Sequence, residues 1–243
     1  MTENETDQQG NGRQPVGKSQ RSSGRNSKRG AQGERREPRP PPKPLTETRL
    51  RDLALHYAAK YATTAAKLES YLTRKIRERG MAEADDGSPQ DIPAIVGGIV
   101  ARLVELKYVD DEAYAKARTG SLLRRGYGKR RVAEDLRYAG VDEHTREDTA
   151  PSTPATREAA ITLARKRRFG PYAADRAPDE GDGDEQPRLE PSKRQKQIAA
   201  MLRAGHGFDT ARIIVDAPNV DTLETWLREA IDEALDDEEG FGL

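Results

Sequence analysis

From Leu45 onward, hydrophobic residues recur at intervals of three and four, which is the spacing of a helix with one buried face. Leu50, Leu53, Tyr57 and Tyr61 show the pattern first, and it returns in most later segments. No segment alternates hydrophobic and polar residues over six positions or more, so the predicted fold class is all-α. Helices are predicted over about 45–61, 68–79, 92–106, 111–125, 129–138, 142–149, 156–168, 193–204, 209–215 and 222–235.

Local signals mark several helix ends. Gly80 and Gly140 each follow a hydrophobic stripe, as expected of the residue that ends a helix, and Asp91 is placed to cap the next one. Ser192 and Gln195 form a capping-box pattern. Gly97-Gly98 lies inside a helix, where each glycine costs about 1 kcal/mol relative to Ala. Either the close approach of another helix or a bend would account for this pair.

A repeat is visible at the ends of three helices. The segments Ile76–Met81, Leu136–Val141 and Leu202–Phe208 each place an arginine and a glycine after a hydrophobic residue, with Gly80, Gly140 and Gly207 in corresponding places. This spacing predicts three tandem three-helix modules that form an elongated, curved array, in which each module contacts mainly its neighbours. The alternative is an unrelated helical bundle whose helices also end at glycine.

The modules account for only part of the chain. Residues 1–44 contain three hydrophobic residues and many Arg, Gly, Ser and Pro, so we expect a disordered basic and Pro-rich tail. That tail is either an arm that contacts nucleic acid or an acidic partner, or a solubilising segment. The expected domains are module 1 at 45–109, module 2 at 110–150, module 3 at 151–217 with an acidic flexible insertion at 171–191, and an acidic C-terminal helix and tail at 218–243.

Charge separates the two ends of the chain. The 243 residues carry 42 Lys+Arg and 42 Asp+Glu, but residues 1–44 hold 10 basic and 5 acidic side chains, whereas 141–243 hold 14 and 23. This asymmetry predicts contacts of two kinds, or a partner surface of mixed sign. The chain has no cysteine, which excludes disulfides and thiol chemistry. No hydrophobic run approaches the roughly 18 residues of a membrane span.

The sequence offers no pattern typical of an enzyme or a metal site. His56, His144 and His206 lie far apart, without the spacing of metal ligands. The segment Gly126–Lys129 resembles part of a phosphate-binding loop, but Lys129 is followed by arginine and the segment joins two helices. We therefore predict no catalytic residue, no cofactor and no metal ligand.

Two basic clusters are the candidate contact sites. The first packs five cations around a Gly-Tyr-Gly turn, where the amides of the following helix add positive potential; it consists of Arg124, Arg125, Lys129, Arg130 and Arg131. The second is a secondary candidate at the end of a helix, formed by Arg165, Lys166, Arg167 and Arg168. Each cluster either binds phosphates or acidic side chains of a partner, or is simply a solvated surface. Trp226 is expected to pack on its own domain, with a partner-binding helix as the alternative.

The central part of the chain resembles the RecX family, regulators of the RecA recombinase. The resemblance lies in Val104–Ala115, Arg124–Val132 and Asp135–Val141, taken in that order, with weaker support from Arg203–Phe208, and it covers about 45–217. It implies a non-enzymatic, cytoplasmic, monomeric helical-repeat protein in DNA repair, homologous recombination and the SOS response. Such a protein binds RecA filaments on single-stranded DNA, with a weak direct contact to DNA, and lowers recombinase and ATPase activity. The alternative function is a helical nucleic-acid-binding protein that acts directly on DNA.

Overall fold

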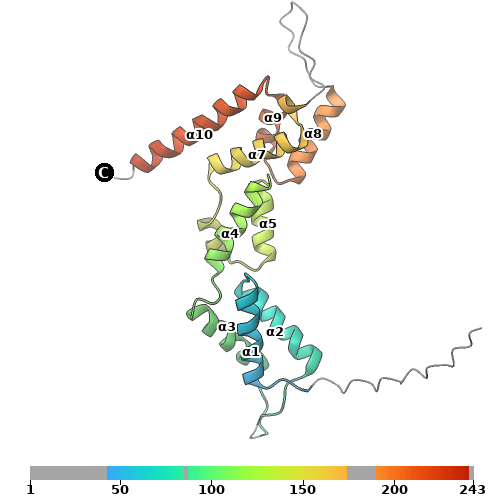
Figure 1. Ribbon diagram of the computed structural model, residues 1–243, viewed down its shortest axis with the longest axis vertical. Helices are drawn as coiled ribbons and strands as arrows, with labels where there is room; N and C mark the ends of the chain where they lie inside the picture. Colours follow the sequence, from blue (N-terminus) through green and yellow to red (C-terminus); the bar gives the residue numbers. More distant parts are fainter. Residues whose placement is uncertain (1–42, 85–86, 174–189, 241–243) are drawn as a thin grey trace, which may run out of the picture. The chain divides into compact units, whose positions relative to one another are not determined.

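A computed structural model describes residues 43–84, 87–173 and 190–240 of the chain, with the side chains of 238–240 left out. Within these ranges the regular elements are helices, apart from a single β-bridge between Leu45 and Met81, so the all-α prediction is confirmed (Figure 1). Most of the predicted tail and of the predicted acidic insertion lies outside the described residues. The helices are α1 Glu47–Lys60, α2 Ala65–Arg79, α3 Ile92–Glu105, α4 Asp111–Arg124, α5 Lys129–Tyr138, α6 Glu143–Asp148, α7 Thr153–Arg167, the 3-10 helix η1 Gly170–Tyr172, α8 Pro191–Arg203, α9 Phe208–Asp216 and α10 Val220–Gly240.

Polar side chains start most of these helices. A hydroxyl or carboxylate just before the helix accepts a hydrogen bond from a first-turn amide, which satisfies a backbone donor that has no partner inside the helix. Asp91 does this for α3, as predicted. The other side chains that cap a helix in this way are Thr46, Thr64, Asp110, Asp142 and Ser152.

Three predicted helix starts are wrong. Thr64 caps α2, so that helix begins at Ala65, earlier than the predicted 68. Ser152 caps α7, so that helix begins at Thr153, earlier than the predicted 156, with Pro154 in its first turn, where proline is well tolerated. The capping box at Ser192 and Gln195 does not form, because α8 already begins at Pro191. The Ser192 hydroxyl instead donates to the Glu190 carboxylate at 2.9 Å.

Three separate hydrophobic cores correspond to the three predicted modules. The first core joins α1, α2 and α3 around Leu50, Leu68 and Val96. The second is small and includes Val132 and Leu136, while the third joins α7, α8 and α9 and also receives α10. Trp226 is half-buried against the third core, with the Arg157 guanidinium 4.7 Å from its ring centroid, which confirms that it packs on its own domain.

The middle helices of successive modules meet end to end (Figure 1). The end of α8 contacts the start of α5, and the end of α5 contacts the start of α2. We call the contact between α2 and α5 the first joint and the contact between α5 and α8 the second joint. In both, a helix C-terminus with its free carbonyls faces a helix N-terminus with its free amides, an arrangement that the two helix dipoles favour.

The glycines at these helix ends correct the predicted repeat. Gly80, Gly140 and Gly205 have φ of 76°, 77° and 93°, a left-handed conformation that suits glycine. Gly207 precedes α9 as its N-cap, so the third repeat glycine is Gly205 and the prediction of Gly207 is wrong. A Cβ added to Gly97 or Gly98 would meet no atom within 4 Å, so no other described helix approaches this pair.

Candidate partner-binding surface

The second joint is built from backbone atoms. The Gly128 amide donates to the Ala204 carbonyl at 2.9 Å, and the Arg130 amide donates to the Gly205 carbonyl at 3.1 Å. These bonds satisfy amides at the start of α5 that have no partner within their own helix. The approach is so close that a Cβ on Gly128 would lie 2.4 Å from the Gly205 oxygen.

This geometry changes the interpretation of the Gly-Tyr-Gly turn. The Gly128 and Arg130 amides already bind carbonyls of the chain itself, so they do not form a cradle for an external phosphate. Of the amides at Lys129–Arg131 that were expected to add positive potential, the Arg130 amide is therefore already paired within the chain. Any anion bound here has to be held by side chains.

His206 is buried at the same joint and is only 2% exposed. Its Nε2 lies 3.0 Å from the Gly126 carbonyl, and because a carbonyl only accepts, Nε2–H is the donor. Burial lowers the pKa of His206 below its usual 6.5, and the hydrogen bond to Gly126 opposes this shift only in part. The ring is therefore neutral at physiological pH, and it packs in the contact between the second and third modules.

The five cations predicted around the turn are all exposed, but they face different surroundings. The Arg125 guanidinium lies 5.1 Å from the Tyr127 ring centroid. The Arg130 guanidinium donates to the Leu202 carbonyl at 2.8 Å and so strengthens the second joint. Arg131 lies 3.5 Å from the Glu134 carboxylate. Lys129 lines a separate hollow beside α6, and Arg124 is the last residue of α4.

One pocket brings the two predicted clusters together. It has a volume of about 240 Å³ and lies between the α4–α5 turn, the end of α7 and the end of α8. We call it the basic pocket: Arg125 comes from the first cluster, Lys166 and Arg167 come from the second, and Arg203 comes from α8. Tyr127 and Phe169 supply aromatic walls, and none of its lining residues is acidic.

The remaining members of the second cluster lie beside the basic pocket. Arg165 has its guanidinium 5.7 Å from the Tyr172 ring centroid, and Arg168 ends α7 in a left-handed conformation with φ of 56°. Both are exposed. Cations in the last turn of α7 also interact favourably with its dipole, so part of this cluster stabilises its own helix.

Arg203 was not among the predicted contact residues, because it is distant in sequence from both clusters. A signal was present in the repeat: Arg203 precedes Ala204-Gly205, in the segment that corresponds to Tyr138-Ala139-Gly140. The position two residues before the repeat glycine is therefore exposed at a joint in both modules. Tyr138 is 92% exposed, and Arg203 is also exposed.

Within the described ranges, no group of three or more His, Asp or Glu side chains is arranged to hold a metal ion. Among the helices that the structure describes, none is both long enough and hydrophobic enough to cross a bilayer. The chemistry that this surface offers is electrostatic. Arginine and lysine around an aromatic wall can bind phosphate or carboxylate groups through charge-assisted hydrogen bonds.

Comparison with known proteins finds similar sequences and structures. Residues 110–149, from the start of α4 to the end of α6, match the second three-helix domain of RecX. A solved structure, the crystal structure of RecX from Lactobacillus salivarius, is 19% identical and has a TM-score of 0.49, with 75% of this chain and 96% of that one covered.

Two curated relatives extend over most of the helical region. The regulatory protein RecX of Myxococcus xanthus is 32% identical over 179 residues, covering 72% of this chain and 89% of the relative. The regulatory protein RecX of Agrobacterium fabrum is 30% identical over 163 residues, covering 65% and 77%. With this identity maintained over nearly the whole length of a curated relative, the chain belongs to the RecX family of regulatory proteins.

Proposed function

We propose that the chain regulates the RecA recombinase by binding RecA filaments on single-stranded DNA and lowering their recombinase and ATPase activity. Membership of a family of regulatory proteins supports a regulatory role. The observation that carries the proposal is the basic pocket, where two modules gather Arg125, Lys166, Arg167 and Arg203 with no acidic lining residue. Such a site fits the phosphates or acidic side chains of a nucleoprotein filament.

The modules are expected to lie along the filament groove. Several moderate contacts made by one chain reinforce each other, because the first contact raises the effective concentration of the next. A chain bound across neighbouring RecA subunits would block strand exchange and slow the addition of RecA monomers. In the cytoplasm this activity would limit homologous recombination, DNA repair and the SOS response.

The decisive experiment measures the DNA-dependent ATPase of RecA with and without this protein. We expect the rate to fall as the protein is added. A rate that stays unchanged when the protein is present in excess over RecA would contradict the proposal.

A binding experiment separates this proposal from direct action on DNA. A filament regulator should bind RecA-coated single strands much more tightly than naked DNA. A protein that acts directly on DNA should bind naked duplex equally well, with an affinity that falls steeply as salt is added. Equal affinity for naked and coated DNA would favour the second function.

A further inference from the structure

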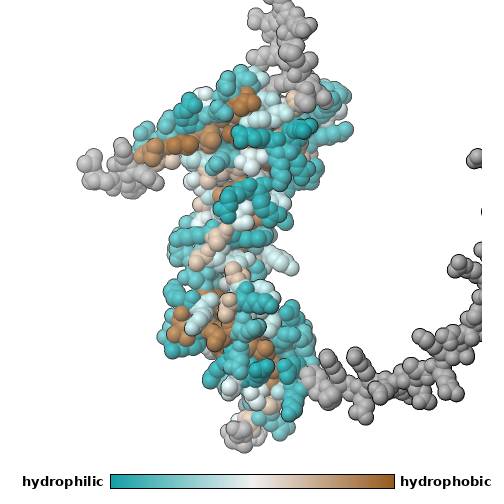
Figure 2. Space-filling view, in the orientation of Figure 1, coloured by the Kyte–Doolittle hydropathy of each residue, from teal (hydrophilic) through white to brown (hydrophobic). Residues whose placement is uncertain are grey.

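The cations of the basic pocket have no acidic partner within the described part of the chain. Hydrophilic residues cover much of the surface visible in Figure 2, so charge alone does not distinguish this pocket from its surroundings. Nearby, Arg130 and Arg131 both pair with Glu134, at 3.9 and 3.5 Å. By contrast, no described acidic side chain pairs with any of the four pocket cations, Arg125, Lys166, Arg167 and Arg203. Four unpaired cations in one hollow repel each other, and an anionic ligand would relieve this repulsion.

Helix dipoles explain only part of this charge. The pocket lies at the C-terminal ends of α4, α7 and α8, and each end carries roughly −0.5 of an elementary charge, or roughly −1.5 in all. Four cations exceed this charge. Carbonyls at these ends are bound by other groups, since the Leu202 carbonyl accepts from the Arg130 guanidinium and the Ala164 carbonyl accepts from the Phe169 amide. Among the described residues, no carbonyl accepts a hydrogen bond from the side chains of the four cations, so these side chains are available to a ligand.

Aromatic walls give the pocket a second kind of surface. Tyr127 and Phe169 are half-buried, and packing against the third core holds their rings in place. Leu163, Ala200 and Ala204 add hydrophobic atoms to the lining. The volume of about 240 Å³ lies just below the roughly 300–1,000 Å³ of pockets that enclose a whole small molecule. A single flat ring with a charged group at the rim fits such a space, whereas a protein helix or a DNA duplex would not enter it.

This combination of surfaces favours a nucleotide over an acidic side chain. A phosphate accepts several hydrogen bonds at once, which suits the fork of an arginine guanidinium. A base has a flat face that stacks on an aromatic ring. A carboxylate would use the cations but leave the aromatic walls uncovered. Inside a duplex the base is stacked and out of reach, so the nucleotide that fits is an unpaired one.

We propose that the basic pocket binds one unpaired nucleotide, with its phosphate on the cations and its base against Tyr127 and Phe169. A single DNA strand and a free nucleotide share this chemistry, and competition distinguishes the two sources. The proposal uses the pocket on which the proposed function rests, and it adds the chemical class of the ligand. Because one such contact is weak, a naked strand binds less tightly than a filament, where several contacts of one chain reinforce each other.

Fluorescence anisotropy of a labelled thymidine oligonucleotide, measured with the full-length protein and without RecA, tests the proposal. An abasic strand of the same length has the same phosphates but no bases, and its dissociation constant should be at least about tenfold higher. Unlabelled thymidine monophosphate identifies the source. Displacement of the strand at a similar nucleotide concentration would assign the pocket to free nucleotides, and no displacement would assign it to the strand.

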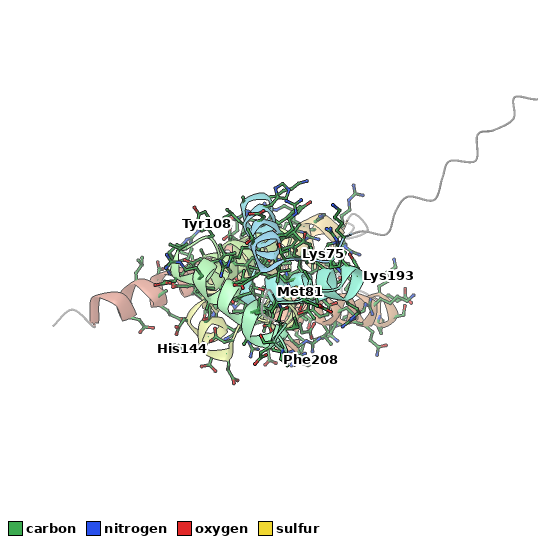
Figure 3. The ribbon with its side chains drawn as sticks, turned by 90° about the horizontal axis from the view of Figure 1, so that it is seen from below. Lys75, Met81, Tyr108, His144, Lys193 and Phe208 are labelled. Atoms are coloured by element: carbon green, nitrogen blue, oxygen red, sulfur yellow. The ribbon has the colours of Figure 1, made fainter. Side chains whose placement is uncertain are left out.

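Two double variants test the role of the aromatic walls. Tyr127→Leu with Phe169→Leu keeps hydrophobic side chains but removes both flat rings, and it should raise the dissociation constant of the thymidine strand to that of the abasic strand. The matched control, Tyr138→Leu with Phe208→Leu, removes two aromatic rings that are 92% and 54% exposed outside the pocket lining. Phe208 is labelled in Figure 3. The control should bind the thymidine strand like wild type.

Arg203→Ala keeps the proposal testable if the ring variant does not fold normally, because Arg203 is exposed. Its loss should weaken the thymidine and abasic strands by the same factor, since both contain the phosphate. Equal wild-type affinity for the two strands would overturn the proposal, as would wild-type binding by the folded ring variant or by Arg203→Ala. A polyglutamate peptide that displaces the strand as readily as unlabelled strand does would also overturn it. RecA is absent from these measurements, so their failure leaves the ATPase test of the proposed function intact.

Discussion

The two joints of the chain connect the same parts of successive modules with different chemistry. At the first joint the Thr64 hydroxyl, which also caps α2, donates to the Ala139 carbonyl at 2.5 Å. The start of α4 supports this joint, because the Asp111 carboxylate accepts the Ala65 amide of α2 at 2.9 Å. At the second joint backbone amides at Gly128 and Arg130 meet the carbonyls of Ala204 and Gly205 directly. The first joint is therefore closed by side chains, whereas the second is closed mainly by the backbone.

This difference decides what each joint can tolerate. A side chain can shift or be replaced, so the first joint can be adjusted by substitution. A backbone contact excludes any side chain at Gly128 and fixes the distance between α5 and α8. The basic pocket takes Arg125 from the α4–α5 turn and Arg203 from α8, so its geometry depends on the more rigid joint.

The largest expected effect comes from Gly128→Ala. The new Cβ would lie 2.4 Å from the Gly205 carbonyl oxygen, which is backbone and cannot rotate away. Separating the joint would break two backbone hydrogen bonds, and we expect a loss of about 3 kcal/mol in the free energy of unfolding. Urea denaturation measures it. Gly97→Ala is the control, because its site is open and Ala should stabilise α3 by about 1 kcal/mol. Equal effects of the two substitutions would show that the second joint does not stabilise the chain.

Gly140→Ala should cost nearly as much, about 2–3 kcal/mol, because the Ala66 Cβ that obstructs it is fixed to its own backbone and cannot rotate away, although a substitution at Ala66 can remove it. A Cβ there would lie 2.3 Å from the Ala66 Cβ, and φ of 77° adds about 1–2 kcal/mol for a residue other than glycine. Adding Ala66→Gly removes the obstructing carbon and should recover the share of the lost stability that comes from this contact. In a double-mutant cycle the double variant should therefore lose less free energy of unfolding than the sum of the two single variants. The effects of Ala66→Gly and Gly128→Ala on the free energy of unfolding should instead be additive, because these two residues lie at different joints. Additivity in both pairs would contradict the distinction between the joints.

A pH titration separates the joints by their buried ionisable groups. The lowered pKa of His206 means that the unfolded chain takes up its proton at a higher pH than the folded chain. The contribution of the neutral ring to the free energy of unfolding is complete above pH 6.5. It is lost as the pH falls from 6.5 through the lower pKa of the folded chain. His206→Gln keeps a donor for the Gly126 carbonyl but does not titrate. Its free energy of unfolding should fall less on mild acidification than that of wild type, and an equal fall would exclude His206 as the cause.

The smallest effect is expected from Asp111→Asn at the first joint. Burial raises the pKa of Asp111 above 3.8, although the hydrogen bond from the Ala65 amide opposes the shift. The folded chain thus holds this proton more tightly than the unfolded chain, and the wild type loses stability as the pH rises through the folded pKa. Asparagine keeps an acceptor for Ala65 and avoids this loss. We expect the free energy of unfolding, measured by urea denaturation, to rise by up to about 1 kcal/mol at neutral pH and to match that of wild type in acid. A rise that does not depend on pH would exclude the carboxylate as its source.

Hydrophobic spacing and capping residues were sufficient to predict the helices. The predictions around Asp91, Asp110 and Lys129 agree with the structure because strong local signals coincide there with a clear hydrophobic stripe. The start of α8 was predicted wrongly because proline at a first helical position competes with a capping box. Local chemistry thus decides where a helix begins and ends, and the end can be predicted from the sequence where only one such local signal is present.

The contacts between modules could not be predicted in this way. Gly128 and Gly205 are distant in sequence, and nothing near either residue shows that it meets the other. The basic pocket depends on that joint, so the sequence showed two separate clusters and left out Arg203. The repeat was the available signal, but choosing Gly207 as its third glycine shifted the register and hid the equivalence of Arg203 with Tyr138.

The measurement that most directly tests the central claim is the DNA-dependent ATPase rate of RecA in the presence of a basic-pocket variant. The variant changes Arg125, Lys166, Arg167 and Arg203 to Ala. Its matched control changes four exposed cations elsewhere to Ala, namely Lys60, Arg74, Arg77 and Lys116. Both sets are surface charges that contribute about 0–1 kcal/mol per pair to folding, so both proteins should fold normally. We predict that inhibition is lost in the pocket variant, which would need at least about tenfold more protein for the same effect, and is kept in the control. A folded pocket variant that inhibits RecA at wild-type concentrations would contradict the account.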